Sequence, residues 1–259
     1  MREAAGTQTS TPRILALGLV AGVMAGLFGV GGGTVLVPGM VLLLHLTQHR
    51  AHATSLAAII VTAPAAALGF ALDGAVSWEA AGAITAGALV GAVAGAALMH
   101  RLSPRGLRAA FAVLMLAAAA RLVFQVDLTP GETVPAMTAA VLGGLVVLGL
   151  AGGTLSALMG VGGGVIMVPA MVLLFGFGQH VAEGTSLLVI VPTAVMGATR
   201  HARRGYTDWR LGLLIGAGGI LGGLVGAQIA LALSATWLQR LFAALLIYTG
   251  ARLLRPRSD

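Results

Sequence analysis

The sequence predicts an all-α, polytopic membrane helical bundle made of two inverted repeats, and two observations carry this prediction. With 58% hydrophobic residues, 9% charged residues and a mean hydropathy of +0.98, the chain has too little polar surface for a soluble domain of 259 residues. Residues 26–63 and 157–194 are also near-copies at a constant offset of 131, each with a triple glycine between apolar segments. We therefore predict a first repeat over residues 1–130 and a second over 131–259.

The hydropathy pattern predicts ten apolar segments, five in each repeat. They cover residues 13–29, 34–46, 53–72, 78–100, 107–124, 135–159, 165–177, 184–199, 209–233 and 236–254. In each half, two segments flank the glycines and three spanning helices follow. The segments after the glycines correspond to only ~20 Å of helix, short of a ~30 Å hydrocarbon core. Either a hairpin that enters and turns back or two tilted short helices would fit.

Loop charges predict how each repeat is inserted. The loop near Asp73 and Glu79 is acidic, whereas its counterpart in the second repeat is rich in arginine (Arg200, Arg203, Arg204 and Arg210). Equivalent loops of opposite charge belong on opposite sides of a membrane. The assignment that satisfies them puts loops 45–52, 101–107 and 200–208 and both termini in the cytoplasm, and loops 73–77, 125–134 and 178–183 outside. The repeats are then inverted; a parallel, eight-crossing arrangement would place the arginines outside.

Small residues at helical spacing predict where helices approach closely. Gly87, Gly91 and Gly95 recur at intervals of four, and Gly218, Gly222 and Gly226 do the same in the second repeat. Such spacing lets helix backbones touch, so we interpret these faces as packing surfaces. The net charge of +7 comes from single arginines between spans, which predicts orientation in a bilayer and no nucleic-acid partner.

The glycine motifs are the first candidate binding feature. A run of glycines permits positive φ and leaves amide N–H groups unshielded, and each run precedes a helix whose N-terminus favours an anion. Inverted repeats bring such motifs to a shared axis, where carriers commonly bind their substrate. The candidates are Gly31, Gly32, Gly33 and Thr34 in the first repeat and Gly162, Gly163 and Gly164 in the second. The alternative is a tight hairpin turn that only needs glycine.

A second shared constellation follows each glycine motif. Thr54 and Ser55 are matched by Thr185 and Ser186, and we list all four as candidate substrate ligands. The alternative is that these hydroxyls only cap the helix that they open. His49 and His180 also match, and are candidates for proton coupling because histidine titrates near neutral pH. Their predicted loop positions equally suit ordinary solvated histidines.

The sequence contains no candidate catalytic residues. It shows no carboxylate dyad, no nucleophile with a base, no phosphate-binding loop and no metal cluster, and it has no cysteine. We therefore predict no enzyme, no cofactor and no metal. The expected partners are a small anionic substrate and the lipid bilayer, and a homodimer is compatible with the sequence.

The glycine motifs resemble those of the sulfite exporter TauE/SafE family of membrane transporters. The resemblance rests on Gly29-x-Gly31-Gly32-Gly33-x4-Pro38 with Thr54-Ser55, and on the second copy Gly160-x-Gly162-Gly163-Gly164-x4-Pro169 with Thr185-Ser186. It extends over residues 13–254. It implies a multi-pass protein of the bacterial cytoplasmic membrane that moves sulfite, sulfoacetate or a related organosulfonate, usually outward.

Two other functions remain open from the sequence. A non-transporting membrane scaffold or accessory subunit would use the glycines only for tight packing. An anion channel would share the same spans and motifs, and saturable transport with counterflow would separate a carrier from a pore.

Overall fold

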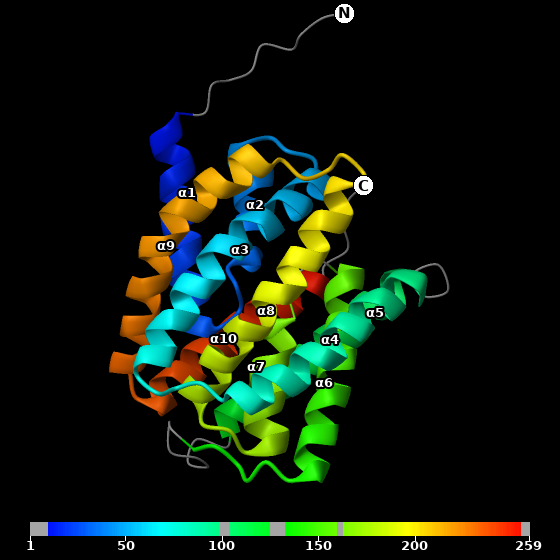
Figure 1. Cartoon of the computed structure of the whole chain (residues 1–259), viewed down its shortest axis with the longest axis vertical. Coiled ribbons are helices and arrows are strands. Elements are labelled where there is room, and N and C mark those ends of the chain that lie inside the picture. Colours follow the sequence, from blue (N-terminus) through cyan, green and yellow to red (C-terminus); the bar gives the residue numbers. More distant parts are fainter. Residues whose placement is uncertain (1–9, 99–103, 125–132, 160–162, 255–259) are drawn as a thin grey trace, which may run out of the picture.

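The computed structural model describes residues 10–98, 104–124, 133–159 and 163–254, and within them every regular element is a helix. The ten helices are α1 (Thr11–Phe28), α2 (Gly33–Leu43), α3 (Gln48–Leu72), α4 (Trp78–Leu98), α5 (Pro104–Phe124), α6 (Ala139–Met159), α7 (Gly164–Phe175), α8 (Gln179–Ala202), α9 (Trp209–Ala232) and α10 (Ala235–Leu254). This confirms the predicted helical bundle, which Figure 1 shows from the side. The division into units 1–130 and 131–259 stays a prediction.

Helix boundaries follow the local chemistry in most places. α1 ends where Gly29 takes a left-handed conformation, with φ of 66°, and α7 ends in the same way at Gly176. The predicted starts of the third span in each repeat were wrong. α3 begins at Gln48 and α8 at Gln179, five residues before the predicted residues 53 and 184, because the polar residues there continue the helix.

The helices α3 and α8 run antiparallel, as inverted repeats require. The amide of Ser77, in the turn after α3, donates to Thr185 Oγ1 near the start of α8 at 2.9 Å. The amide of Asp208, in the turn after α8, donates to Thr54 Oγ1 near the start of α3 at 3.1 Å. The two bonds are equivalent in the two repeats, because the donors Ser77 and Asp208 are 131 residues apart and so are the acceptors Thr54 and Thr185. The end of each helix therefore lies beside the start of the other, as Figure 1 also shows.

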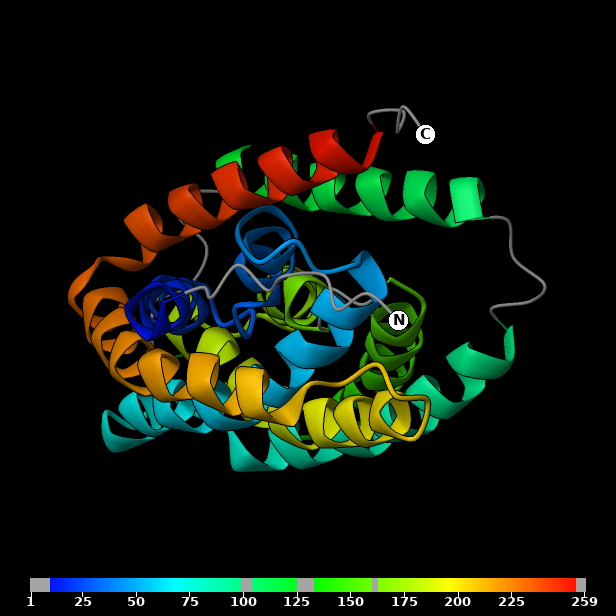
Figure 2. The ribbon, with the colours of Figure 1, turned by 90° about the horizontal axis from the view of Figure 1, so that it is seen from above.

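The short segments after the glycines form hairpins. α2 has 11 residues and α7 has 12, and α2 returns to the end of the bundle from which α1 starts (Figure 1). Seen from above, α2 and α7 lie inside the bundle, with α5 and α10 along one side and α3 and α8 along the other (Figure 2). Of the two predicted alternatives, the returning hairpin is the one adopted.

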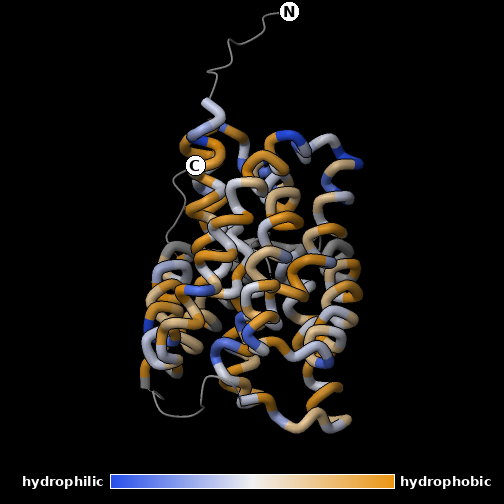
Figure 3. Tube along the Cα trace, turned by 60° about the vertical axis from the view of Figure 1, so that its left-hand side comes forward, coloured by the Kyte–Doolittle hydropathy of each residue, from blue (hydrophilic) through white to orange (hydrophobic). Residues whose placement is uncertain are grey.

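The surface of the bundle is suited to lipid. Four helices of the described residues are long and apolar enough to cross a membrane, namely α1, α3, α8 and α9. Large hydrophobic side chains are exposed on them, including Leu72, Leu213 and Leu221. Hydrophobic residues extend over most of the chain, and hydrophilic segments lie at its upper end and in short stretches of its lower half (Figure 3). The protein is a multi-pass membrane protein.

Glycines join the two halves by direct backbone contact. α1 packs along α9 in parallel, so that β-carbons added at Gly22 and Gly222 would collide with the carbonyl oxygens of Gly219 and Leu19. α4 packs along α6 in the same way, with Gly91 against the Leu150 carbonyl. The packing role predicted for the glycine-rich faces is therefore confirmed at Gly87, Gly91, Gly218, Gly222 and Gly226.

Replacing Gly22 by alanine tests this packing. The added methyl would meet backbone atoms of α9, which cannot move aside without separating the helices. We expect Gly22→Ala to lower the free energy of unfolding in detergent micelles by about 1–3 kcal/mol. The matched control is Gly82→Ala in α4, where an added β-carbon meets nothing within 4 Å, and it should lose no stability. Equal stability of the two variants would contradict the interpretation.

The predicted orientation is testable because the chain contains no cysteine. Asp73 and Arg204 are both exposed, in the turns after α3 and α8 respectively. We expect Asp73→Cys to react with a membrane-impermeant maleimide from outside intact cells, and Arg204→Cys to react only after the membrane is opened. Labelling of both variants from the same side would refute antiparallel insertion.

Candidate functional site

The first glycine motif forms a buried turn between α1 and α2. Gly29, Gly31 and Gly32 all have positive φ, between 66° and 75°, a conformation that side chains disfavour. A β-carbon at Gly32 would also lie 2.7 Å from the Ala21 carbonyl oxygen. The turn therefore needs glycine for its backbone shape as well as for space.

The two glycine motifs meet half-way along the bundle. A β-carbon added at Gly164 would lie 2.7 Å from the Gly29 carbonyl oxygen and 3.0 Å from Val30 Cα. The first turn also packs against both long antiparallel helices, since a β-carbon at Gly31 would lie 3.0 Å from Ile190 and 3.6 Å from Ile59. These isoleucines are each the twelfth residue of a helix of 24 or 25 residues. The turns thus lie near the middle of the membrane-spanning length.

The first turn presents several backbone donors together. Within the part of the chain that the structure describes, the amides of Gly31, Gly32, Gly33 and Thr34 donate no hydrogen bond, whereas Val35 and Leu36 bond to the Gly32 carbonyl. This is the pattern of a helix N-terminus, which has unpaired N–H groups and a partial positive charge. Thr34 is half-buried and the three glycines are buried. Gly162 of the second motif lies outside the described residues, while Gly163 and Gly164 open α7.

The threonines of the second constellation connect the two repeats. Thr54 and Thr185 are fully buried and accept the amide hydrogen bonds that lie at either end of the α3–α8 pair. The alternative that they cap a helix start was wrong, because α3 and α8 begin at Gln48 and Gln179, one to two turns earlier. A role as substrate ligands stays a prediction.

Both serines of this constellation are buried, and Ser186 lies next to the first glycine turn. Ser186 Oγ donates to the Gly29 carbonyl and also lies 2.9 Å from the Glu183 carbonyl. Ser55 Oγ donates to the His52 carbonyl at 2.7 Å. Ser186 therefore holds α8 against the first glycine turn.

The two candidate histidines lie in different surroundings. His49 is exposed at the start of α3, with its ring centroid 6.1 Å from that of Tyr206. His180 is only 9% exposed, and its Nε2 lies 3.1 Å from the Ala230 carbonyl and 3.2 Å from that of Leu233 at the end of α9. The alternative of a solvated loop residue was therefore wrong for His180. Proton coupling through either histidine stays a prediction.

Glu183 is a buried residue that the sequence interpretation had placed in an outer loop. The structure places it in the second turn of α8 with 0% exposure. A β-carbon at Gly29 would lie 2.6 Å from Glu183 Cα, so this carboxylate is carried by backbone in contact with the first glycine turn. One signal was available: Glu183 precedes Thr185-Ser186 as His52 precedes Thr54-Ser55, both ionisable at one repeat position.

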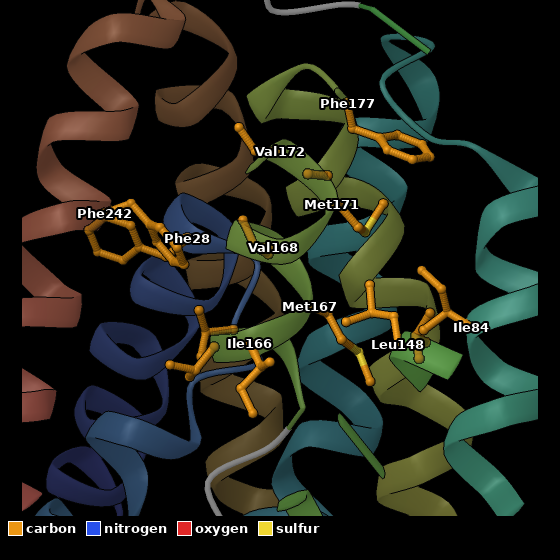
Figure 4. Close-up of a cluster of buried hydrophobic side chains, with 14 of the residues drawn as sticks. Phe28, Ile84, Leu148, Ile166, Met167, Val168, Met171, Val172, Phe177 and Phe242 are labelled. Atoms are coloured by element: carbon orange, nitrogen blue, oxygen red, sulfur yellow. The ribbon is translucent and has the colours of Figure 1, made fainter. Parts of the chain in front are cut away.

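The two hairpins are enclosed to different degrees. Eight residues of α7 are buried, against three of α2. Figure 4 shows Val168, Met171 and Val172 of α7 within a cluster that includes Phe28 and Phe242, whose ring centroids are 6.0 Å apart. Gln48 and His49 are exposed at the start of α3, while Gln179 and His180 are buried at the start of α8. The structure is therefore closed at the α8 start and more open at the α3 start.

Two cavities lined by described residues are apolar, and neither is lined by a glycine of the two motifs. One, of about 350 Å³, is lined by residues of α3 and α8 with Trp78, and one of about 190 Å³ lies between α5 and α7. The second includes Val165 and Ile166, next to Gly164. Neither has the polar lining that a small anion requires.

Replacing Ser186 by alanine tests the bond that connects α8 to the first glycine turn. The Gly29 carbonyl would lose its buried donor, so we expect Ser186→Ala to lower the free energy of unfolding by about 1–3 kcal/mol. Thr199→Ala is the control, because Thr199 is exposed and bonds only to carbonyls of its own helix; we expect it to change stability by less than about 0.5 kcal/mol. Denaturant titration in detergent measures both, and an unchanged Ser186→Ala protein would show that the bond contributes nothing.

Comparison with known proteins agrees with this architecture. The chain is 28% identical to the probable membrane transporter protein YunE of Bacillus subtilis over 264 residues, which covers 93% of this chain and 96% of that protein. It is also 28% identical to the probable membrane transporter protein YdhB of the same organism, covering 80% and 85%. A probable membrane transporter protein of Xylella fastidiosa shares 28% identity, with 89% of each chain covered. Residues 2–122 and 145–259 match the sulfite exporter TauE/SafE family, and the chain therefore belongs to this family of membrane transporters.

Proposed function

We propose that this protein is a secondary carrier that exports a small sulfur-containing anion across the bacterial cytoplasmic membrane. The substrate class is sulfite, which the name of the family contains, or sulfoacetate or a related organosulfonate, which the resemblance described above implies. The observation that carries the proposal is the contact at mid-depth between the first glycine turn and Gly164 at the start of α7. The first turn presents four consecutive amides that donate no bond to described residues. Backbone donors at a helix N-terminus bind an oxyanion without a buried cation.

The contacts around the turns support alternating access. A carrier with inverted repeats exposes one side at a time, as one repeat takes the conformation that the other had. The two repeats differ in the burial of these segments. In the second repeat α7 and the start of α8 are enclosed, whereas in the first repeat α2 and the start of α3 are more exposed. With the predicted orientation, the present state is closed to the outside and open towards the cytoplasm, from which an exporter loads.

The hydroxyls and histidines have different places in this proposal. Thr54, Thr185, Ser55 and Ser186 already bond to protein groups, so they shape the site and reach a substrate only if those bonds exchange. Thr34 is half-buried in the first turn of α2 and is the hydroxyl best placed beside the free amides. His49 and His180 remain proposed proton-coupling groups.

Uptake of labelled sulfite into proteoliposomes tests the transport claim. We expect saturable uptake, counterflow driven by internal sulfite, and competition by organosulfonates in preference to other anions. Uptake that does not saturate and shows no counterflow would identify a channel. A protein that neither binds nor moves any anion of the panel would identify a scaffold or accessory subunit.

The variant Gly163→Val tests the glycine site itself. Gly163 has ordinary helical angles. An added β-carbon would lie 2.6 Å from the methyl carbon at the flexible end of Met167 and 3.6 Å, an ordinary contact distance, from the Gly152 carbonyl oxygen, so the protein should still fold and insert. The branched side chain would cover the amides at the start of α7, and we expect sulfite flux to fall at least about tenfold, equivalent to ~1.4 kcal/mol. Gly143→Val in α6, which has open space at its β-carbon, is the control and should transport normally. Normal flux in Gly163→Val would refute the glycine site.

A further inference from the structure

The most isolated buried polar group of the described residues is the carboxyl of Glu183. Its Oε1 accepts a hydrogen bond from Gln179 Nε2 at 2.7 Å, while its Oε2 has no partner. The Oε1 of Gln179 also has no partner. Both side chains have 0% exposure. The pair thus holds two unpartnered acceptor oxygens, and neither of them receives a hydrogen bond from the Gln179 amide group or from another described residue.

We propose that Glu183 is the proton-binding site that couples anion movement to the proton gradient. This inference rests on the proposed carrier function and names its coupling ion. It assigns the main coupling role to a carboxyl group instead of to His49 or His180.

Charge and hydrogen bonding favour a proton as the ion. Burying an ionised carboxylate without a counter-ion costs many kcal/mol, and such groups become neutral instead. A proton on Glu183 removes the charge and turns an unpartnered acceptor into an O–H donor. Within membrane spans, ionisable residues commonly form proton pathways.

The ligand set does not suit a divalent metal ion. The two unpartnered oxygens are those of Glu183 and Gln179. Calcium and magnesium take about six oxygen ligands or more. The Gly29 carbonyl already accepts a hydrogen bond from the Ser186 hydroxyl, which also lies 2.9 Å from the Glu183 carbonyl.

The surrounding ionisable groups leave Glu183 isolated. His180 lies on the same helix, with its ring bonded to α9 carbonyls. On the elements packed around α8, Asp73 at the end of α3, Glu79 at the start of α4 and Arg240 of α10 are all exposed. None of these described side chains bonds to the carboxyl, and α7 carries no ionisable residue. A proton is therefore the simplest means of neutralising it.

Direct contact links this carboxyl to the proposed anion site. Gly29 packs on the backbone of Glu183, and a β-carbon there would lie 2.8 Å from the Glu183 carbonyl oxygen. Ser186, three residues later on α8, donates to the Gly29 carbonyl. Loss of the proton would require Glu183 to reach water, which displaces the start of α8 and with it the first glycine turn. The repeat position in α3 is His52, so only this half carries a carboxyl group here.

The position of Glu183 gives a short path to one side of the membrane. It is the fifth residue of α8, about 6 Å along the axis from the helix start. That end of α8 lies on the side predicted to be outside. Opening of this closed end would therefore expose Glu183 to external protons.

The variant Glu183→Gln in proteoliposomes tests the proposal. For the wild-type protein, we expect sulfite flux to change several-fold with an imposed pH gradient, and sulfite addition to move protons that a trapped pH-sensitive dye reports. Glu183→Gln keeps the shape and is permanently neutral, so it should retain saturable sulfite counterflow but lose both proton responses. Glu79→Gln, which removes an exposed carboxylate of α4, is the control and should keep both.

A second measurement does not depend on any variant folding. The purified wild-type protein at neutral pH should show the infrared carbonyl band of a protonated carboxyl group. The chain has only eight Asp and Glu residues, so few other side chains contribute to this region of the spectrum. Lack of this band, or a full pH-gradient response in Glu183→Gln, would overturn the assignment. So would wild-type flux that follows a sodium gradient and ignores pH. A wild-type protein that shows the band but moves no anion would instead overturn the proposed carrier function.

Discussion

A chain that turns back half-way across a membrane must satisfy or shield its backbone polar groups without water, and this constraint shapes the structure. Irregular backbone at membrane depth is tolerated only where protein buries it or where it lines a polar cavity. The first glycine turn meets this condition by packing between α3 and α8, and Ser186 supplies a donor for the Gly29 carbonyl. In the proposed carrier, the amides of this turn that donate no bond to described residues would bind the anion.

The second consequence of the constraint is the close interlock of the two halves. Hydrophobic burial does not drive helices together in lipid, so association depends on close packing and on hydrogen bonds between helices. Glycines of α1 touch the backbone of α9, and glycines of α4 touch that of α6, so each half holds the first helix of the other. The turns after α3 and α8 are fixed by hydrogen bonds to Thr185 and Thr54. A rearrangement of one half therefore moves parts of both.

The symmetry is strong in backbone and weaker in chemistry. Ile59 and Ile190, which are 131 residues apart, both lie beside Gly31 of the first glycine turn, and Thr54 and Thr185 make equivalent bonds. The starts of α3 and α8 differ, because His52 is half-buried near the ring of His201 whereas Glu183 is fully buried beside Gln179. In the proposed carrier, an exchange of conformations between the halves would expose different ionisable groups on each side.

Much of this protein was determined by sequence alone: the membrane class, the ten helices, their duplication and the glycine turns. Those features depend on composition, on local backbone preference and on an internal repeat, all of which are visible along one chain. The tertiary structure decided that Thr54 and Thr185 hold turns of the opposite repeat, and that Gln179, His180 and Glu183 are buried helical residues instead of a loop. In a sequence, polar residues at the start of a helix cannot be distinguished from the polar residues of a loop. Only the contact of Gly29 with Glu183, the bond of His180 to the end of α9 and the burial of these side chains show that water does not reach them.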